Sequence, residues 1–150
     1  MDIKTAIKEG TNILKDNHIV SAQLDAELLL ASAIGESRKY IILNHNLPLE
    51  DKYLKSYKDL IKKRSLKKPI AYLINKKFFW NYEFFVNKST LIPRPDTELI
   101  IEKVLDLTKS KDKMRVLDIG VGSGCILLSI LKERKNFYGT GIDICKNCIK

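Results

Sequence analysis

Apolar residues recur at helical spacing through the first half of the chain. Spacings of three and four predict an N-terminal helix whose inner face carries Ile3, Ala6, Ile7, Ile13 and Leu14. Ser21 is suited to cap a second helix over AQLDAELLLASAI, and Gly35 is suited to end it in a left-handed conformation. Ser37 is placed to cap a short third helix through RKYIILN.

A longer amphipathic helix is predicted after Pro48. Its apolar positions, again three and four apart, are Tyr53, Leu54, Tyr57, Leu60 and Ile61. Lysines stand at many of the other positions and are expected on the outer surface of that helix. Residues 1–74 are therefore predicted to fold as a small helical bundle.

The pattern then changes from helix to strand. KFFWNYEFFV has aromatic and β-branched residues on both sides of Asn81-Tyr82, which indicates a β-hairpin within residues 75–92. In the following LIPRPDTELIIEKVLDLTK, two prolines favour extended backbone, and Asp96 or Thr97 is suited to cap a helix. The inner face of this linker helix is predicted to use Ile100, Ile101, Val104, Leu105 and Leu107.

Residues 114–143 have the order strand, glycine turn, helix, strand and acid. RVLDI reads as a short buried strand, GVGSG as the turn, CILLSILKER as the helix and FYGTGI as the second strand, which Asp143 ends. This order is typical of the first half of a nucleotide-binding α/β domain. The predicted fold class is therefore α + α/β, with the helical bundle and hairpin followed by a two-stranded start of a Rossmann-like domain.

The glycine turn indicates the class of cofactor. Three glycines let the backbone approach a ligand closely, but the dinucleotide fingerprint needs a third glycine at position 125, where Cys125 stands. Asp118, two residues before the turn, would repel a pyrophosphate and suits a cationic amino group, while Asp143 can accept both hydroxyls of a ribose. This combination favours S-adenosylmethionine over NAD.

The alternative is that Asp118 caps the turn and Asp143 caps the next helix. No Gly-Lys-Ser/Thr supports a phosphate loop.

Composition and charge narrow the class of protein. With 45% hydrophobic and 30% charged residues, no long apolar run and no secretion signal, we expect a soluble, cytoplasmic protein with no membrane span. Nearly all of the net charge of +9 lies in residues 51–77, which hold ten Lys/Arg and two Asp/Glu. This segment is interpreted as a solvated helix face, with a contact to nucleic acid or to the ribosome as the alternative.

The cysteines add little to this prediction. Cys125, Cys145 and Cys148 are odd in number, which argues against a disulfide framework. The C-x-x-C formed by Cys145 and Cys148 has no second pair and no histidine nearby in sequence. We therefore expect no metal site and ordinary reduced thiols.

These motifs together resemble the N-terminal part of the HemK/PrmC-type glutamine methyltransferases of bacterial peptide chain release factors. The similar stretches, which cover essentially the whole chain, are DAELLLASAIG, KKPIAYLINKKFFWNYEFFV, LIPRPDTE, RVLDIGVGSGCILLSI and GIDI. LIPRPDTE just before the glycine turn is the most specific of them. The resemblance implies a class I S-adenosylmethionine-dependent enzyme that methylates the glutamine side-chain amide of the release factor's Gly-Gly-Gln loop.

The resemblance also assigns residues. It implies that Gly120, Val121, Gly122, Ser123 and Gly124 surround the methionine end of S-adenosylmethionine, with Asp143 on the ribose. Asp118, which the glycine turn itself pointed to, completes the predicted cofactor-binding residues. Arg94, Pro95 and Thr97 would lie near the same pocket, and no residue of this chain is assigned a catalytic role. Residues 1–74 would dock the release factor, residues 75–92 would form the hairpin linker, and residues 93–150 would form a truncated methyltransferase domain.

Two departures from the family pattern stand out. Asn75 occupies a position where the family commonly has glycine, which affects one turn. The Asn-Pro-Pro-Tyr tetrapeptide, with which the family presents the substrate amide, does not occur in the sequence. Two strands alone would also leave an unpaired sheet edge. We therefore expect the chain to be an inactive fragment that binds cofactor weakly or not at all.

Two other functions are compatible with the sequence. The same chemistry suits an exocyclic amine of nucleic acid, in which case the basic segment would contact phosphates and binding would weaken with salt. A binding module without enzymatic activity, built on the helical bundle, is the other. Calorimetry with S-adenosylmethionine distinguishes the module from an enzyme.

Overall fold

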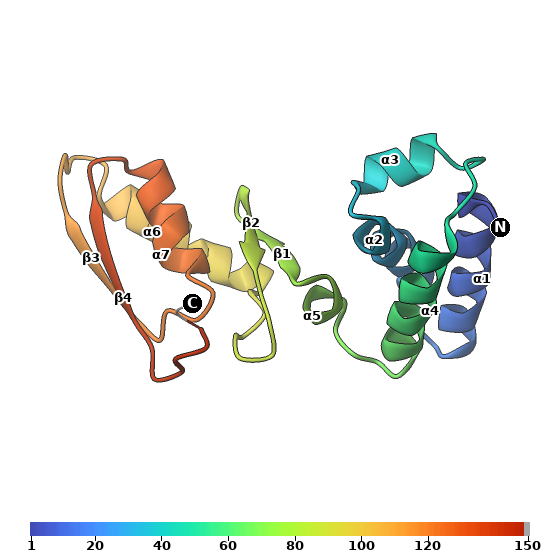
Figure 1. Ribbon diagram of the computed structural model, residues 1–150. Helices are drawn as coiled ribbons and strands as arrows, with labels where there is room; N and C mark the ends of the chain where they lie inside the picture. Colours follow the sequence, from blue (N-terminus) through green and yellow to red (C-terminus); the bar gives the residue numbers. More distant parts are fainter. Residues whose placement is uncertain (149–150) are drawn as a thin grey trace. The chain divides into compact units, whose positions relative to one another are not determined.

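A computed structural model of the chain describes residues 1–148. These form two compact units, Met1–Ile74 and a second unit that begins at Asn75. The first unit is entirely helical (Figure 1). Its helices are α1 (Ile3–Asp16), α2 (Ala22–Ile34), α3 (Arg38–Leu43), α4 (Asp51–Ser65) and α5 (Ile70–Ile74). The described part of the second unit contains two two-stranded sheets and the helices α6 and α7, whose bounds are given below.

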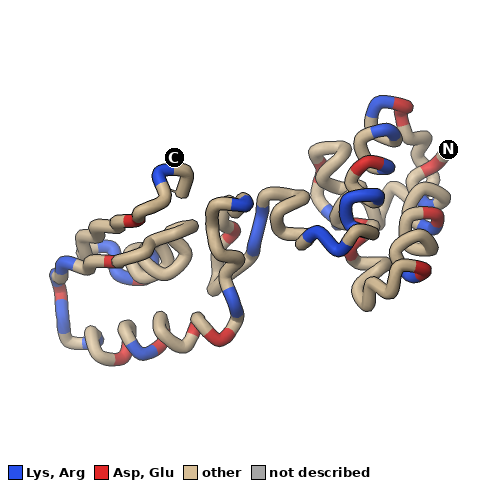
Figure 2. Tube along the Cα trace, turned by 90° about the horizontal axis from the view of Figure 1, so that it is seen from below, with Lys and Arg blue, Asp and Glu red and all other residues tan. Residues whose placement is uncertain are grey.

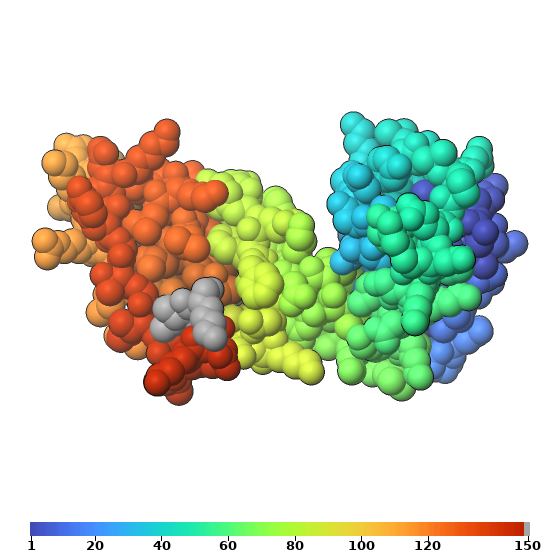
Figure 3. Space-filling model, in the orientation of Figure 1, coloured from blue at the N-terminus to red at the C-terminus, as the bar shows by residue number. Residues whose placement is uncertain are grey.

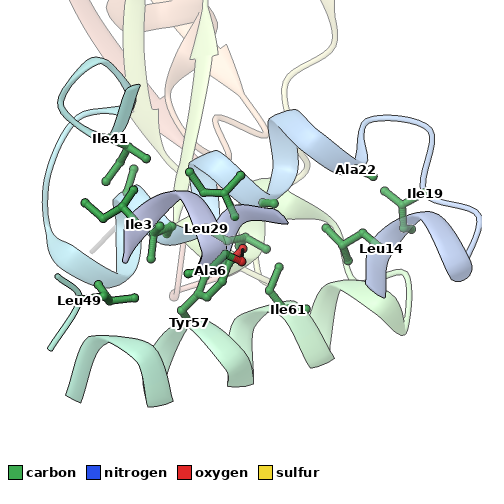
Figure 4. Close-up of a cluster of buried hydrophobic side chains, with 14 residues drawn as sticks. Ile3, Ala6, Leu14, Ile19, Ala22, Leu29, Ile41, Leu49, Tyr57 and Ile61 are labelled. Carbon is green, nitrogen blue, oxygen red and sulfur yellow. Dashed lines mark hydrogen bonds between the residues drawn. The ribbon is translucent and has the colours of Figure 1, made fainter. Parts of the chain in front are cut away.

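Helix α2 is the centre of the first unit. It packs against α1, α3, α4 and α5, and its residues Ala26, Leu29 and Leu30 are fully buried. Side chains of α1 and α4 complete this core, which Figure 4 shows in close-up with Ala6, Leu14, Tyr57 and Ile61 among its members. The predicted helical bundle and its predicted apolar faces are therefore present, with one exception. Ile13 of α1 is 46% exposed.

The end of α2 and the start of α3 follow their sequence signals. Gly35 ends α2 with φ of +85°, and the Ser37 hydroxyl accepts the Tyr40 N–H at 3.1 Å at the start of α3. Ser21 stands at the start of α2, but its side chain makes no capping hydrogen bond. At α1 the capping side chain is Asp2, which accepts the Thr5 N–H at 2.7 Å.

Two acidic side chains of α2 are buried and paired with arginines. Asp25, 2% exposed as a residue, accepts the Arg64 Nε–H of α4 at 2.7 Å. Glu27, also buried, accepts the Arg38 Nε–H of α3 at 2.7 Å. A buried carboxylate needs such a partner because the loss of its hydration is costly. These ion pairs fix α3 and α4 against α2.

The sequence predicts that the basic residues 51–77 form one solvated helix face. The structure shows that they do not. Helix α4 ends at Ser65, and Arg64 points inward to Asp25. Lys67 and Lys68 follow in the turn, while Lys76 and Lys77 belong to a strand of the second unit. Lys and Arg are accordingly spread along both units (Figure 2). The prediction was wrong because a run of positive charge in the sequence does not show which of its side chains pairs with a buried carboxylate.

The second unit begins with an antiparallel hairpin of β1 (Lys76–Phe79) and β2 (Tyr82–Phe85). Phe79 pairs with Tyr82, so the turn consists of Trp80 and Asn81, one residue earlier than the sequence suggested. Trp80 has φ of +55°, and its backbone N–H donates to Glu98 at 2.8 Å. Asn75 has the same positive φ, a region that asparagine enters more readily than most residues, so it can stand in for glycine.

The remaining elements form the start of a Rossmann-like fold. After a 3-10 turn (Pro95–Thr97) come α6 (Glu98–Leu107), β3 (Arg115–Ile119), α7 (Cys125–Glu133) and β4 (Tyr138–Ile142). β3 and β4 are parallel, α7 packs on them, and α6 packs on α7 (Figure 1). Thr97 precedes α6 without a side-chain capping bond.

A second core joins the hairpin to these helices. Its buried members are Phe79, Phe84, Ile101, Ile130 and Phe137. Val104 and Leu105 of α6 pack against it as predicted, but Ile100 and Leu107 are exposed. On the sheet, Leu117, Ile119, Tyr138 and Ile142 are between 47% and 75% exposed. Within residues 1–148, no helix has both the length and the apolar character that a membrane crossing needs.

The Asp25–Arg64 pair gives a direct test of the first unit. Arg64→Met leaves the Asp25 carboxylate buried without its partner, and we expect a loss of about 3 kcal/mol in the free energy of unfolding. Lys63→Met is the matched control because the Lys63–Asp59 pair is exposed on both sides, and it is expected to cost less than about 0.5 kcal/mol. Urea denaturation followed by circular dichroism measures both. Equal losses would contradict the structural role of the buried pair.

Gly10 of α1 gives a second test. A methyl group there would collide with the Tyr57 phenol oxygen and approach the Ile61 Cδ1 to 3.0 Å. Gly10→Ala should therefore destabilise the chain by about 1–3 kcal/mol, although the same change usually stabilises a helix. Tyr57→Phe removes the colliding oxygen, so the double variant should lose less than the sum of the single losses. Strict additivity in a thermal unfolding cycle would refute this packing.

Candidate functional site

The glycine turn connects β3 to α7 and is held at the end of the sheet. Gly120, Gly122 and Gly124 all have positive φ, at +82°, +53° and +75°. The Gly120 and Val121 N–H groups both donate to the Ile142 carbonyl of β4, at 2.8 and 3.0 Å. An L side chain would be strained at each of the three glycines, so the path of the turn requires them.

The neighbouring strand is shaped to receive this turn. A Cβ atom at Gly141 would lie 2.7 Å from Val121 Cγ2, and one at Gly139 would lie 2.7 Å from Leu131 Cδ1. The two glycines of β4 therefore let the turn and α7 lie directly on the strand. On its other side the turn is open, because a Cβ placed at Gly120 would meet no atom within 4 Å. A ligand can reach the backbone there.

Asp143 links the end of β4 to the glycine turn. Its Oδ2 accepts the Gly122 N–H at 2.9 Å, and its Oδ1 accepts the Cys145 N–H at 2.8 Å. These two bonds hold the pKa of Asp143 below its usual value, and the bond from Cys145 has the larger effect. The carboxylate is therefore ionised at neutral pH, and each oxygen keeps a lone pair for a further donor.

Asp118 lies at the carboxyl end of β3. Partial burial raises the pKa of the Asp118 carboxyl, and repulsion from Asp143 raises it further. The backbone N–H of Leu127, in the first turn of α7, opposes this rise. Asp118 thus sits where it stabilises the positive end of that helix. Together, the two acids make this edge of the sheet favourable for a cation.

A cavity of about 780 Å³ lies beside the turn. Its walls include the aromatic side chains Tyr82, Phe84 and Phe85 of the hairpin, the polar residues Ser89 and Thr90, and Ser123 of the glycine turn. Lys132 of α7 also lines it, with Nζ 4.3 Å from the centre of the Tyr82 ring. Such a wall combines stacking surface, hydroxyl groups and one cation.

The structure brings some of the predicted site residues together. Gly122 and Asp143 are in direct contact, and Asp118 is close enough to Asp143 for mutual repulsion. Of the predicted residues only Ser123 lines the cavity. Arg94, just before the 3-10 turn, and Pro95 and Thr97 within it do not line it. Sequence reasoning missed Tyr82 and Lys132, for which no sequence signal exists. Among the described residues, no group of three or more His, Cys, Asp or Glu could hold a metal ion.

Comparison with known proteins gives this site a family context. Residues 5–74 match the family model described as the PrmC N-terminal domain. Proteins named release factor glutamine methyltransferase are similar along the whole chain. That of Leptospira interrogans is 40% identical over 149 residues, covering 99% of this chain and 52% of the relative. That of Buchnera aphidicola is 38% identical over 149 residues, with shares of 99% and 53%.

The similarity extends to further bacteria, and each match covers about half of the relative. The Salmonella typhimurium protein of the same name is 38% identical over 143 residues, which are 95% of this chain and 50% of the relative. The chain therefore spans about half the length of the curated relatives it matches. The part of those relatives that it matches includes both the helical unit and the glycine turn.

The contacts of Asp143 are testable by amide hydrogen exchange. In Asp143→Ala the Gly122 and Cys145 amides lose their acceptor, so both should exchange several-fold faster. Asp143→Asn keeps one acceptor oxygen, so one of the two amides should stay protected. Asp112→Ala, an exposed aspartate in the preceding loop, is the control and should change neither amide. Unchanged exchange at Gly122 in Asp143→Ala would contradict the link.

Proposed function

Because the chain belongs to the PrmC-type release factor glutamine methyltransferase family, we propose that it carries the methyl-donor turn and the docking domain of such an enzyme. The reaction is transfer of a methyl group from S-adenosylmethionine to the side-chain amide of the glutamine in a release factor's Gly-Gly-Gln loop. The proposed setting is the cytoplasm, with bacterial peptide chain release factors as partners. The observation that carries the proposal is the contact between Gly122 and Asp143 at the open glycine turn.

The residues present fit S-adenosylmethionine. The open side of Gly120 leaves room for the cofactor to touch the backbone from Gly120 to Gly124. Asp143 is ionised and has free lone pairs, as a group that accepts two ribose hydroxyls must. The negative charge of Asp118 and Asp143 suits a cofactor whose methionine end carries a sulfonium and an ammonium group.

In this mechanism the chain binds and orients. When bound, S-adenosylmethionine supplies an activated methyl group. Asp143 would fix the adenosine end, while the backbone from Gly120 to Gly124 would fix the methionine end, so that the sulfonium has one position relative to the sheet. Methyl transfer depends mainly on such alignment with the nucleophile. Arg94, Pro95 and Thr97 are proposed to border the same pocket.

The parts of the chain are proposed to have different roles. We propose that residues 1–74 dock the release factor, that residues 75–92 form the hairpin linker, and that residues 93–150 belong to the methyltransferase domain. The sequence has no Asn-Pro-Pro-Tyr to hold the substrate amide. The 150-residue chain is therefore proposed not to turn over by itself and to bind the cofactor weakly or not at all.

The test joins residues 1–150 to the remaining half of the Leptospira interrogans relative. Label from methyl-labelled S-adenosylmethionine should enter a release factor with the chimera and not with the 150-residue chain alone. Asp143→Ala in the chimera should lower transfer at least about tenfold, since each pair of ribose hydrogen bonds is worth roughly 1–3 kcal/mol. Asp112→Ala is the matched control and should leave transfer unchanged.

Other outcomes discriminate between the functions. Robust transfer by the 150-residue chain would overturn its proposed inactivity, and an Asp143→Ala chimera as active as its parent would overturn the assignment of the donor site. Circular dichroism shows whether the chimera has folded, and calorimetry with S-adenosylmethionine shows whether it binds the cofactor. Methylation of RNA or DNA in place of the release factor, with binding that weakens steeply with salt, would favour the nucleic-acid alternative. A chimera that folds but binds no cofactor would favour the non-enzymatic module.

A further inference from the structure

The two cysteines of the C-x-x-C lie in one tight turn directly after Asp143. The Cys148 N–H donates to the Cys145 carbonyl at 2.9 Å, which closes a four-residue turn. The outer Cα atoms of such a turn are less than about 7 Å apart. Disulfides join Cα atoms up to about 6.8 Å apart, so the pair can be bridged with little movement of the backbone. Both thiols are partly exposed, and the segment just before residue 148 lies at the surface in Figure 3.

The two thiols differ in their surroundings. Cys148 Sγ donates to the Ser89 carbonyl at 2.8 Å and can also donate to the Cys145 sulfur, one acceptor at a time because it has one hydrogen. Donation from Cys148 lowers the pKa of Cys145, whereas burial raises the pKa of Cys148 to about 11. A thiolate is far more nucleophilic than a thiol. Cys145 is therefore the reactive member, and Cys148 is placed to react with it afterwards.

The pair is connected to the candidate site on two sides. The Cys145 N–H is held by the Asp143 carboxylate, which also holds Gly122 of the glycine turn. Cys148 lines the 780 Å³ cavity together with Ser89, Thr90 and Ser123. A change in the covalent state of the two sulfurs therefore takes place within the wall of that cavity.

We propose that Cys145 and Cys148 form a redox-active dithiol, which small disulfides such as oxidised glutathione convert reversibly to an intramolecular disulfide. The Cys145 thiolate attacks one sulfur of the small disulfide, forms a mixed disulfide and releases one small thiolate. Cys148, as it loses its proton, attacks Cys145 Sγ and releases the second. Two protein thiols are oxidised, one small disulfide is reduced to two thiols, and the two protons pass to those thiols.

Oxidation has a structural consequence at the cavity. The sulfur of Cys148 has no hydrogen in the disulfide, so it cannot donate to the Ser89 carbonyl. The loop that contains Ser89 then loses this tie to the turn after β4. Insofar as the proposed function holds, the oxidised chain should bind S-adenosylmethionine less tightly than the reduced chain.

The first experiment detects the disulfide itself. The 150-residue chain is equilibrated with reduced and oxidised glutathione, free thiols are blocked with an alkylating reagent, and the peptides are mapped by mass spectrometry. We expect one intramolecular disulfide, between Cys145 and Cys148, that dithiothreitol reverses. Brief alkylation of the reduced chain should modify Cys145 before Cys148 and Cys125.

Matched variants make this result specific. Cys125→Ser keeps the pair and should form the same disulfide, whereas Cys145→Ser should form none. In Cys148→Ser the reaction should stop at a glutathione adduct on Cys145, because the second thiol is missing. A stable adduct in the unmodified chain without an internal disulfide, a disulfide that involves Cys125, or no oxidation at all would overturn the proposal.

The second experiment measures its effect on the site. S-adenosylmethionine is titrated by calorimetry into the reduced, oxidised and re-reduced chimera, and oxidation should weaken binding about threefold or more, as expected for one lost hydrogen bond. Equal affinity in both states would overturn the coupling to the cavity. If no state of the chimera binds, the proposed function fails, while the mapped disulfide stands or falls by the first experiment.

Discussion

The parallel pairing of β3 with β4 is the constraint on which the candidate site depends. In register, Ile119 lies opposite Ile142, so both strands end at the same edge of the sheet. The glycine turn and Asp143 both lie at that edge. The glycine turn leaves β3 there and binds back to the Ile142 carbonyl, and Asp143 leaves β4 there and binds forward to Gly122. An antiparallel pair would have placed these two ends at opposite edges.

The pairing also explains why β4 contains glycine at alternate positions. Gly139 and Gly141 lie under α7 and under Val121, where a single methyl group would force these elements away. The close approach brings the amides of the turn within hydrogen-bond distance of the Asp143 carboxylate. A site that binds a ligand through backbone groups depends on such approach, because backbone groups cannot extend toward the ligand as side chains do.

Local signals predicted several local features, although Ser21 and Thr97 make no side-chain capping bond. Long-range pairing accounts for the larger differences. The left-handed end of α2 at Gly35, the capping by Ser37 and the glycine turn each need only a few neighbouring residues, so their sequence signals sufficed. Arg64 was read as part of a basic surface because its partner, Asp25, stands 39 residues earlier. Likewise, no periodicity shows that Ile100 is exposed while Ile101 is buried, because the hairpin and α7 decide which face of α6 is covered.

The two readings of Asp143 drawn from the sequence, as a ribose acceptor and as a cap of the next turn, are compatible. A carboxylate has about four acceptor positions, and the backbone of Gly122 and Cys145 uses two of them. The same negative charge opposes ionisation of the two thiols. Burial raises the pKa of Cys148 and Asp143 adds to that rise, whereas donation from Cys148 lowers the pKa of Cys145 and Asp143 offsets a part of that lowering. A cationic ligand near Asp143 would offset this repulsion. Ligand binding and ionisation of the thiols are then linked through one carboxylate. The disulfide is linked to the ligand separately and with the opposite sign: if oxidation weakens the affinity for the ligand, the bound ligand must shift the oxidation equilibrium toward the dithiol by the same factor.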